Sequence, residues 1–256
     1  PTDDINKFFV HPATVVYRST VFTLGAAEDY ELNLWSPPPI KASPGNWSLR
    51  KSHMVDVICD SSPKKAAYLL NYFAHMLQKP EEKPGVMIVL KGGQGTGKSA
   101  CLLMVRRIWS GSSLVTADID HVVGRFNSSL ESSYVVQLEE ALFKGNKKGV
   151  DKLKSLISES SCHIEVKYQP PRTIGSLHRF FATTNHKQFS HTDIDDRRHA
   201  FFEVSDSKQG DQSYFDALFA AIFDDQVIAA MIDELKNRDI SEFNVRAVPK
   251  TKDHGD

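Results

Sequence analysis

One eight-residue segment has the residue types that hold a nucleoside triphosphate. It matches the pattern GxxxxGK[ST] and consists of Gly92, Gly93, Gln94, Gly95, Thr96, Gly97, Lys98 and Ser99. Glycines let successive backbone N–H groups curl around a phosphate, and the N-terminus of a following helix adds positive potential. We expect Lys98 to reach the β- and γ-phosphates and the Ser99 hydroxyl to ligate Mg²⁺. The segment therefore predicts binding of ATP with Mg²⁺.

Two adjacent carboxylates, Glu139 and Glu140, follow the apolar run 134–138. ATP hydrolysis needs a carboxylate near Mg²⁺ and usually a second one that orients or deprotonates the attacking water. We assign Glu139 to the metal and Glu140 to the water, although an aspartate is more usual at the first position. The alternative is a solvated start of a helix, where carboxylates suit the helix dipole. Gln137 is a polar residue inside this otherwise apolar run.

Two further segments carry polar residues suited to phosphate chemistry. Asn185 ends the segment Phe-Phe-Ala-Thr-Thr-Asn, where its amide is placed to sense the γ-phosphate or the lytic water; a plain exit from a strand is the alternative. Arg197 and Arg198 follow three aspartates, and either arginine suits an arginine finger, which a neighbouring subunit often supplies. We favour Arg197, and the alternative is a local turn held by salt bridges.

Residues 162–174 alternate in polarity on both sides of Gln-Pro-Pro, which predicts a hairpin. We expect its tip to carry Lys167, Tyr168 and Arg172. A cation beside an aromatic ring is the combination that follows a single-stranded backbone and stacks a base. The alternative is an exposed hairpin with ordinary solvated residues.

The elements expected around these residues alternate between strands and helices. Apolar runs predict strands at 86–90, 134–138, 179–184 and 199–204, and helical patterns occupy 63–78, 99–109, a lysine-rich stretch ending at 160, and 213–237. This order is typical of an α/β fold with a mostly parallel sheet, in which chemistry collects at the carboxyl ends of the strands. The turn-rich segment 79–85 suggests three regions: an N-terminal strand, loop and helix region at 1–84, an ATPase core at 85–206, and a C-terminal helical segment with a polar tail at 207–256.

Composition narrows the classes of function. The 256 residues carry a net charge of −1, which argues against a broad basic face for duplex DNA, so a nucleic-acid site must be local. The three cysteines form no CxxC pair, and no apolar run is long enough to span a bilayer. These features fit a cytoplasmic protein without a membrane segment. Because the chain begins at Pro1 and ends in a polar tail, we expect a fragment of a longer protein; removal of an initiator methionine is the alternative explanation of the start.

With these residues located, the chain resembles the superfamily 3 helicases, in particular the helicase domain of phage and viral primase–helicases of the poxvirus type. The resemblance covers most of the chain and rests on the phosphate loop, the Glu139–Glu140 strand, Lys167 and four further segments: 31–35, 124–127, 183–185 and 196–198. It implies an AAA+-like P-loop NTPase fold, a homo-hexamer with ATP sites between subunits, and translocation on single-stranded DNA. It also implies a primase–polymerase domain on the same full-length chain.

Two other functions remain open from the sequence. A P-loop kinase for a small molecule carries the same loop but transfers phosphate to an acceptor. A nucleotide-gated ring or loading module binds ATP and hydrolyses little. The leading hypothesis is an ATP-driven replicative DNA helicase motor.

Overall fold

The computed structural model describes residues 7, 11, 12, 14–139, 147–185 and 197–249. The chain forms two compact units, Pro1–Trp35 and Ser36–Asp256. The division therefore lies at Trp35, whereas the composition of the linker placed a boundary at 84. Helix α3 (Pro63–Gln78), which precedes that linker, packs against α9 (Asp225–Asn237) and belongs to the larger unit.

The smaller unit contains two short strands, β1 (Ser19–Val21) and β2 (Glu31–Asn33), which pair in parallel. The side chain of Asn33 ties their ends together, because it accepts from the backbone N–H of Thr23 and Trp35 and donates to the Thr23 carbonyl. Phe22 meets Trp35 edge to face at 5.4 Å between ring centroids.

The larger unit is built on a five-stranded sheet in the order β4-β5-β8-β3-β9, and all neighbouring strands are parallel. The strands are β3 (Met87–Lys91), β4 (Ser113–Thr116), β5 (Val135–Glu139), β8 (Arg179–Thr184) and β9 (His199–Glu203). The predicted α/β class with a parallel sheet is confirmed. The sequence patterns found four of these strands and missed β4, which is the short edge strand.

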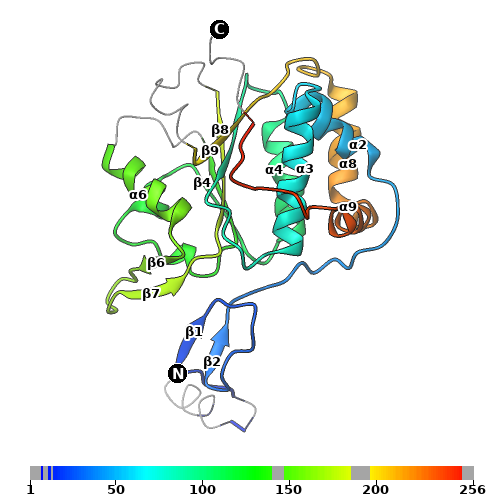
Figure 1. Ribbon diagram of the computed structural model, residues 1–256. Coiled ribbons are helices and arrows are strands. Elements are labelled where there is room, and N and C mark those ends of the chain that lie inside the picture. Colours follow the sequence, from blue (N-terminus) through cyan, green and yellow to red (C-terminus); the bar gives the residue numbers. More distant parts are fainter. Residues whose placement is uncertain (1–6, 8–10, 13, 140–146, 186–196, 250–256) are drawn as a thin grey trace. The chain divides into compact units, whose positions relative to one another are not determined.

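Helices cover both faces of the sheet (Figure 1). One face carries α3, α4 (Lys98–Ile108), α8 (Gln212–Phe223) and α9, with the short α2 (Ser48–Ser52) beside them. On the other face lie α5 (Asp120–Val123), the 3₁₀ turn Ser128–Leu130 and α6 (Lys147–Ser158). An antiparallel hairpin, β6 (Ser161–Ile164) and β7 (Arg172–Gly175), follows α6 and leads directly into β8.

Strand alternation separates two cores. Val136 and Leu138 of β5 and Phe180 of β8 face the cluster that includes Leu153 and Ile157 of α6. Phe181, one residue on, points the other way and meets the rings of Tyr72 and Phe73 of α3, 6.1 and 6.3 Å from its centroid. By the same alternation Gln137 and Glu139 lie on the face covered by α3 and α4. Because Glu139 ends β5 on the face that α3 and α4 cover, we expect the functional site on that face, at the carboxyl ends of the strands.

Local signals explain where the helices begin and end. Ser62 caps α3 by accepting from the Lys65 N–H, and Pro63 occupies the first helical position. The predicted helix 213–237 is two helices, because Asp224 is extended (φ −85°, ψ 114°) and caps α9 through the Gln226 N–H. Residues 1 to about 53 were expected to form short strands and loops, but Ser48–Ser52 form α2, and a π-helical turn, His53–Ile58, follows it. Within the described residues, no helix is both long and apolar enough to cross a membrane.

Candidate functional site

The glycine-rich loop lies between β3 and α4, as the sequence predicted. Gly95 and Gly97 have φ values of +76° and +93°, a region that side chains disfavour. A Cβ on Gly97 would lie 2.4 Å from Cε1 of His53, so any side chain there displaces the histidine. Around Gly95, in contrast, a Cβ would meet no described atom within 4 Å. The loop is therefore packed on one side and open on the other, which suits an anion cradle.

Hydrogen bonds hold the loop in this shape. The backbone N–H of Gly92 donates to the carbonyl of Thr184 on β8 at 3.2 Å, and the Thr96 hydroxyl donates to the carbonyl of Gly93 at 2.9 Å. The ammonium of Lys98 donates to the carbonyls of Gly92, at 2.8 Å, and Gly93. Lys98 is buried and curls back over the loop, so its charge lies among the backbone groups that would surround a phosphate.

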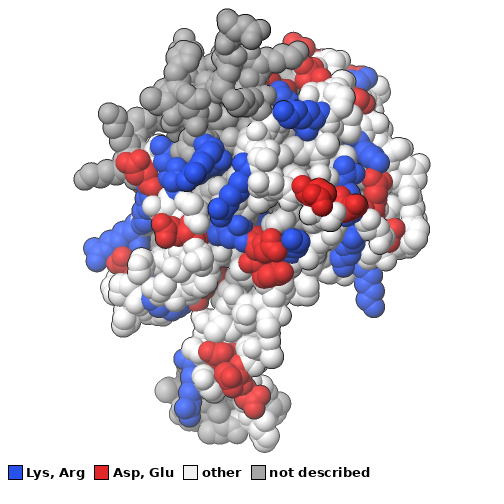
Figure 2. Space-filling model, viewed as in Figure 1, with Lys and Arg blue, Asp and Glu red and all other residues white. Residues whose placement is uncertain are grey.

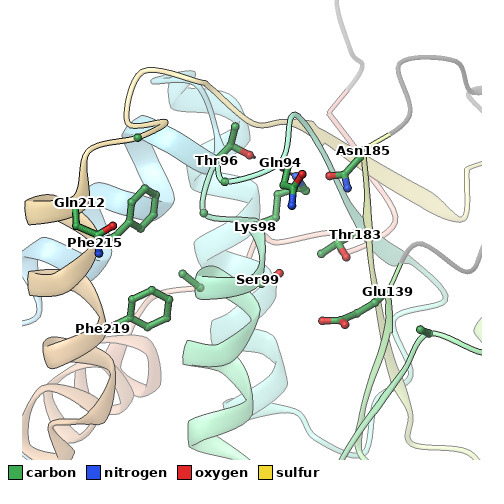
Figure 3. Close-up of a pocket in the computed structure, with 15 residues that line it drawn as sticks. Gln94, Thr96, Lys98, Ser99, Glu139, Thr183, Asn185, Gln212, Phe215 and Phe219 are labelled. Carbon is green, nitrogen blue, oxygen red and sulfur yellow. Dashed lines mark hydrogen bonds between the residues drawn. The ribbon is translucent and has the colours of Figure 1, made fainter.

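The loop opens into a pocket of about 620 Å³, within the range of small-molecule sites. One end is polar, and the residues that line it are Gln94, Gly95, Thr96, Gly97, Lys98, Ser99, Glu139, Thr183 and Asn185. The other end is mainly apolar, and its lining comes from α4, from α8 and from the segment before α8: Ala100, Gly210, Gln212, Phe215 and Phe219. Ala117, directly after β4, also lines the pocket, beside the end of β5. In Figure 3, Glu139 approaches α4 from the strand ends, and Phe215 and Phe219 approach it from α8.

Glu139 projects into the pocket from the end of β5, and in Figure 3 its carboxylate points toward the first turn of α4, where Ser99 lies. Strand register places Glu139 beside Thr183, which itself pairs with Leu90 just before the loop. Gln137, fully buried, donates from Nε2 to the Glu139 carboxylate at 2.9 Å. The polar residue in the apolar run thus orients the carboxylate, and its presence there was the signal for this role.

The oxygen donors here fit a magnesium ion. Carboxylate and hydroxyl oxygens are hard ligands of the kind that Mg²⁺ prefers, and the ion normally keeps several waters and phosphate oxygens as well. Ser99 supplies a hydroxyl from α4 and Glu139 supplies a carboxylate from the facing strand. Arg106 of α4 also approaches this carboxylate: burial lowers the pKa of the Arg106 guanidinium, and the charge of Glu139 opposes that shift.

The structure describes one of the two other residues predicted to act beside the phosphate loop, Asn185, and not the other, Glu140. Asn185 follows β8, lines the pocket, and points toward the loop in Figure 3. Glu140 lies outside the described residues, so its assignment to the attacking water stays a prediction.

Arg197 and Arg198 lie at the amino edge of the sheet, where its parallel strands begin. The phosphate loop lies at the carboxyl edge, where the strands end. The carbonyl of Arg198 accepts from the N–H of Met87, the first residue of β3, whereas the phosphate loop follows the last. The length of β3 separates the two positions, roughly 13 Å at about 3.3 Å per residue. The Arg198 side chain donates to the Ser158 hydroxyl at 3.3 Å, and Arg197 is exposed. Neither arginine lines the pocket of its own chain.

The predicted hairpin exists, and its tip presents Lys167 and Tyr168. Tyr168 is 92% exposed, and the Lys167 ammonium lies 5.0 Å from the centre of its ring. Tyr168 also has a φ of +68°, which is unusual for a non-glycine residue. Arg172 opens β7 directly after the hairpin loop, where it pairs in register with Ile164, and its guanidinium forms an ion pair with Glu131.

Residues 124–127 support this hairpin, a role that the sequence did not reveal. Asn127 is buried and acts as a strand partner, because its side chain donates to the carbonyl of His163 and accepts from the N–H of Glu165, both at 2.9 Å. Arg125 pairs with Glu165 at 2.7 Å and lies over the ring of Phe126, which is 49% exposed. A second cation and aromatic pair therefore stands beside the hairpin.

Charges of both signs are interspersed over the face of the larger unit seen in Figure 2. This pattern agrees with the net charge of −1. Any electrostatic attraction for a nucleic acid is expected to depend on local groups such as Lys167 and Arg125.

Comparison with known proteins places the fold but not the family. A family model described as a family of unknown function (DUF5906) matches residues 90–198, which include the phosphate loop and strands β4 to β8. Among curated proteins, nothing matches. Two structures of the NrS-1 C-terminal region are similar over 90% and 98% of this chain, with TM-scores of 0.73 and 0.74 and 18% identity.

The chain spans 57% and 63% of the length of those two structures. At 18% identity the likeness establishes a shared α/β fold and nothing finer. A JCV helicase with a bound small molecule is also similar over 78% of this chain and 57% of its own, at 15% identity, but its TM-score of 0.45 is too low to support an inference.

Proposed function

We propose that this chain is the ATP-driven motor domain of a replicative DNA helicase of the superfamily 3 type, which translocates on single-stranded DNA as a homo-hexameric ring. The observation that supports this most is the composition of one pocket. It joins a phosphate-binding loop to a carboxylate and an amide at the carboxyl edge of a parallel sheet. Binding, hydrolysis and sensing of ATP need these groups together.

Each residue has a definite task in this proposal. Loop N–H groups and Lys98 bind the β- and γ-phosphates, and Ser99 with Glu139 holds Mg²⁺, which neutralises charge on the phosphate oxygens. Gln137 fixes the orientation of Glu139. Glu140 accepts the proton of the attacking water, and Asn185 hydrogen-bonds the γ-phosphate or that water.

A ring is proposed because the charge-stabilising arginine has to come from elsewhere. Arg197 and Arg198 lie at the amino edge of the sheet, away from the pocket of their own chain. In a head-to-tail ring, one edge of each subunit faces the other edge of its neighbour. Arg197 of one chain then completes the site of the next, which couples hydrolysis to movement between subunits.

The hairpin is the proposed contact with single-stranded DNA. Lys167 attracts the phosphate backbone, and the exposed ring of Tyr168 offers a stacking surface for a base. Arg125 and Phe126 offer the same chemistry beside it. In a hexamer, six copies around a pore concentrate positive charge that a single chain with a net charge of −1 does not have.

The proposed setting is the host cytoplasm during replication of a phage or viral genome, on a chain that also carries a primase–polymerase domain. The NrS-1 structures are themselves of a C-terminal region, and this chain matches only part of that region. These two facts support a motor that forms part of a longer protein.

The decisive experiment compares ATP hydrolysis with strand displacement. Lys98→Ala should abolish both activities, because the phosphates lose their cation. Lys167→Ala should keep hydrolysis within about twofold of the unaltered chain and lose fork unwinding. Lys64→Ala, which removes an exposed lysine on α3, is the matched control and should change neither. Equal loss of both activities in Lys167→Ala would contradict the role of the hairpin.

The same preparations separate the two rival functions. A small-molecule kinase would remain a monomer or dimer and would not respond to single-stranded DNA, so light scattering with ATP and DNA distinguishes it. A nucleotide-gated loading module would form rings and bind ATP but hydrolyse little. In that case Glu140→Gln would leave single-turnover hydrolysis unchanged.

A further inference from the structure

The pocket extends beyond the groups that a triphosphate needs. Its polar end holds the phosphate loop and the oxygen donors, whereas its far wall carries two phenylalanine rings from α8, Phe215 and Phe219. These residues are four apart, so their side chains lie on the same face of the helix. Figure 3 shows both rings directed from α8 toward α4 and the loop.

Helix α8 is fixed against the phosphate loop at its first turn. Gln209, just before the helix, donates to the carbonyl of Gln94 in the loop at 2.8 Å. His53 lies between the two elements, with one ring nitrogen 3.1 Å from the Gly97 carbonyl and the other 2.9 Å from the Tyr214 hydroxyl. Asp211 caps the helix through the N–H of Tyr214. The aromatic wall is therefore held at a set position relative to the phosphates.

Packing within the chain leaves the outer ring of this wall, that of Phe219, partly exposed. Phe219 is 41% exposed although it is a large apolar residue. Phe215 is held from behind, since it meets the rings of His53 and Tyr214 edge to face at 6.3 and 5.3 Å. Such an arrangement presents a rigid apolar surface to whatever occupies the pocket, and planar groups gain most from it.

We propose that Phe215 and Phe219 form a subsite for the nucleobase of the bound nucleoside triphosphate. This inference rests on the proposed function, because it assumes that the loop binds the phosphates. The base lies against the ring of Phe219, and Phe215 closes the inner end of the subsite. Base and aromatic ring attract by stacking, which tolerates any base because every base has a flat face.

The alternative to a nucleobase at this aromatic wall is a protein partner. The aromatic stripe continues one turn further to Phe223, which is 60% exposed, lies 5.7 Å from the Arg107 guanidinium carbon, and does not line the pocket. A docking partner would use Phe223 together with Phe219, whereas a base would use Phe219 and Phe215 without Phe223. Phe223 therefore supplies a matched control on the same helix.

The test measures, by calorimetry with Mg²⁺, the dissociation constants of ATP and of inorganic tripolyphosphate, which has no base. Phe219→Ala should weaken ATP binding by roughly tenfold and leave tripolyphosphate within about twofold. Phe219→Leu, which keeps an apolar side chain of similar reach, should weaken ATP in the same direction. Phe223→Ala should change neither ligand.

The possible results separate this proposal from the one on which it depends. If Phe219→Ala weakens both ligands equally or neither, the base subsite is wrong while the phosphate loop stands. If Phe219→Ala and Phe223→Ala change the oligomeric state alike, the wall is a protein interface and the proposal is overturned. If the unaltered chain binds neither ligand, the proposed function itself fails. Lys98→Ala should weaken both ligands together.

Discussion

The two edges of the central sheet differ in how they treat polar groups. At the carboxyl edge the loop, Glu139 and Asn185 face an open pocket. At the amino edge Lys83 donates to Ser176 and to the Leu156 carbonyl, and His178 lies between Ser176 and the Leu130 carbonyl. Burial lowers the pKa of Lys83 to about 7 and that of His178 to about 4. One edge offers its polar groups to a ligand, and the other uses them internally.

This difference indicates that the two ends of β8 have different roles. The strand begins beside the buried network and the base of the hairpin, and it ends at Asn185 in the pocket. At its start Arg179 is fully buried and donates to the carbonyls of Lys79 and Pro80, which fixes the linker to the sheet. The amino edge therefore anchors the hairpin, and the carboxyl edge presents its polar groups to the pocket, where the proposed function has them respond to nucleotide.

A large effect is expected from closing the phosphate loop at the carboxyl edge. In Gly97→Ala the added Cβ meets His53 and strains a left-handed residue, so ATP binding and hydrolysis should fall on the order of a hundredfold. Calorimetry and a phosphate-release assay measure the two quantities. Gly175→Ala in β7 is the control, since its Cβ would meet no described atom within 4 Å, and it should change neither.

At the amino edge, His178 should make the free energy of unfolding depend on pH. The folded pKa of His178, about 4, lies below its ordinary value of 6.5, so the unfolded chain takes up a proton first as pH falls. The free energy of unfolding should therefore decline between pH 6.5 and 4, by about 3 kcal/mol from this residue. Urea unfolding at several pH values measures it. His178→Gln should flatten this slope, and an unchanged slope would remove His178 as the cause.

A smaller effect is expected from freeing the hairpin. Asn127→Ala leaves the Glu165 N–H and the His163 carbonyl without their partner, at a cost of about 2 kcal/mol. Fork unwinding and stimulation of hydrolysis by single-stranded DNA should decline, while hydrolysis without DNA stays within about twofold. Asn127→Asp retains the acceptor for Glu165 and should give an intermediate loss. If hydrolysis without DNA falls as far as unwinding, the hairpin does not act independently of the ATP site.

The smallest effect should come from releasing Glu139. Gln137→Leu removes the hydrogen bond that orients this carboxylate, so the Mg²⁺ concentration for half-maximal hydrolysis should rise roughly tenfold. Stability should hold or increase slightly, because the Gln137 Oε1 is buried and lacks a hydrogen-bond partner among the described residues. Titration of hydrolysis with Mg²⁺ checks the first expectation and thermal unfolding the second. An unchanged Mg²⁺ requirement would mean that Gln137 does not orient the carboxylate.

The sequence predicted those candidate groups whose signal lies within one segment. The phosphate loop follows from its own glycines, and the strands that carry Glu139 and Asn185 follow from apolar runs longer than a turn. It did not reveal contacts made between distant segments, such as His53 under Gly97, Asn127 beside the hairpin or Phe219 in the pocket. Single histidines, asparagines and phenylalanines give no local signal, because only the folded chain defines their neighbours.

The break at Asp224 and the position of Arg172 show the same limit. A capping aspartate inside a helical pattern divides one predicted helix into two, and Arg172, predicted as a DNA contact, forms an ion pair with Glu131, which is remote in the sequence. Periodicity predicts that an element exists, whereas its ends and its ion pairs depend on residues far along the chain.

The central claim is that the pocket of one chain is completed by the amino edge of another, and mixing two inactive variants tests it most directly. Lys98→Ala and Arg197→Ala alone should each lower ATP hydrolysis by a factor on the order of a thousand. Mixed in equal amounts and allowed to exchange, they should recover roughly a quarter of full activity, because one interface in four then pairs an intact loop with an intact arginine. Mixed rings that stay inactive, or Arg197→Ala that is fully active alone, would contradict the account.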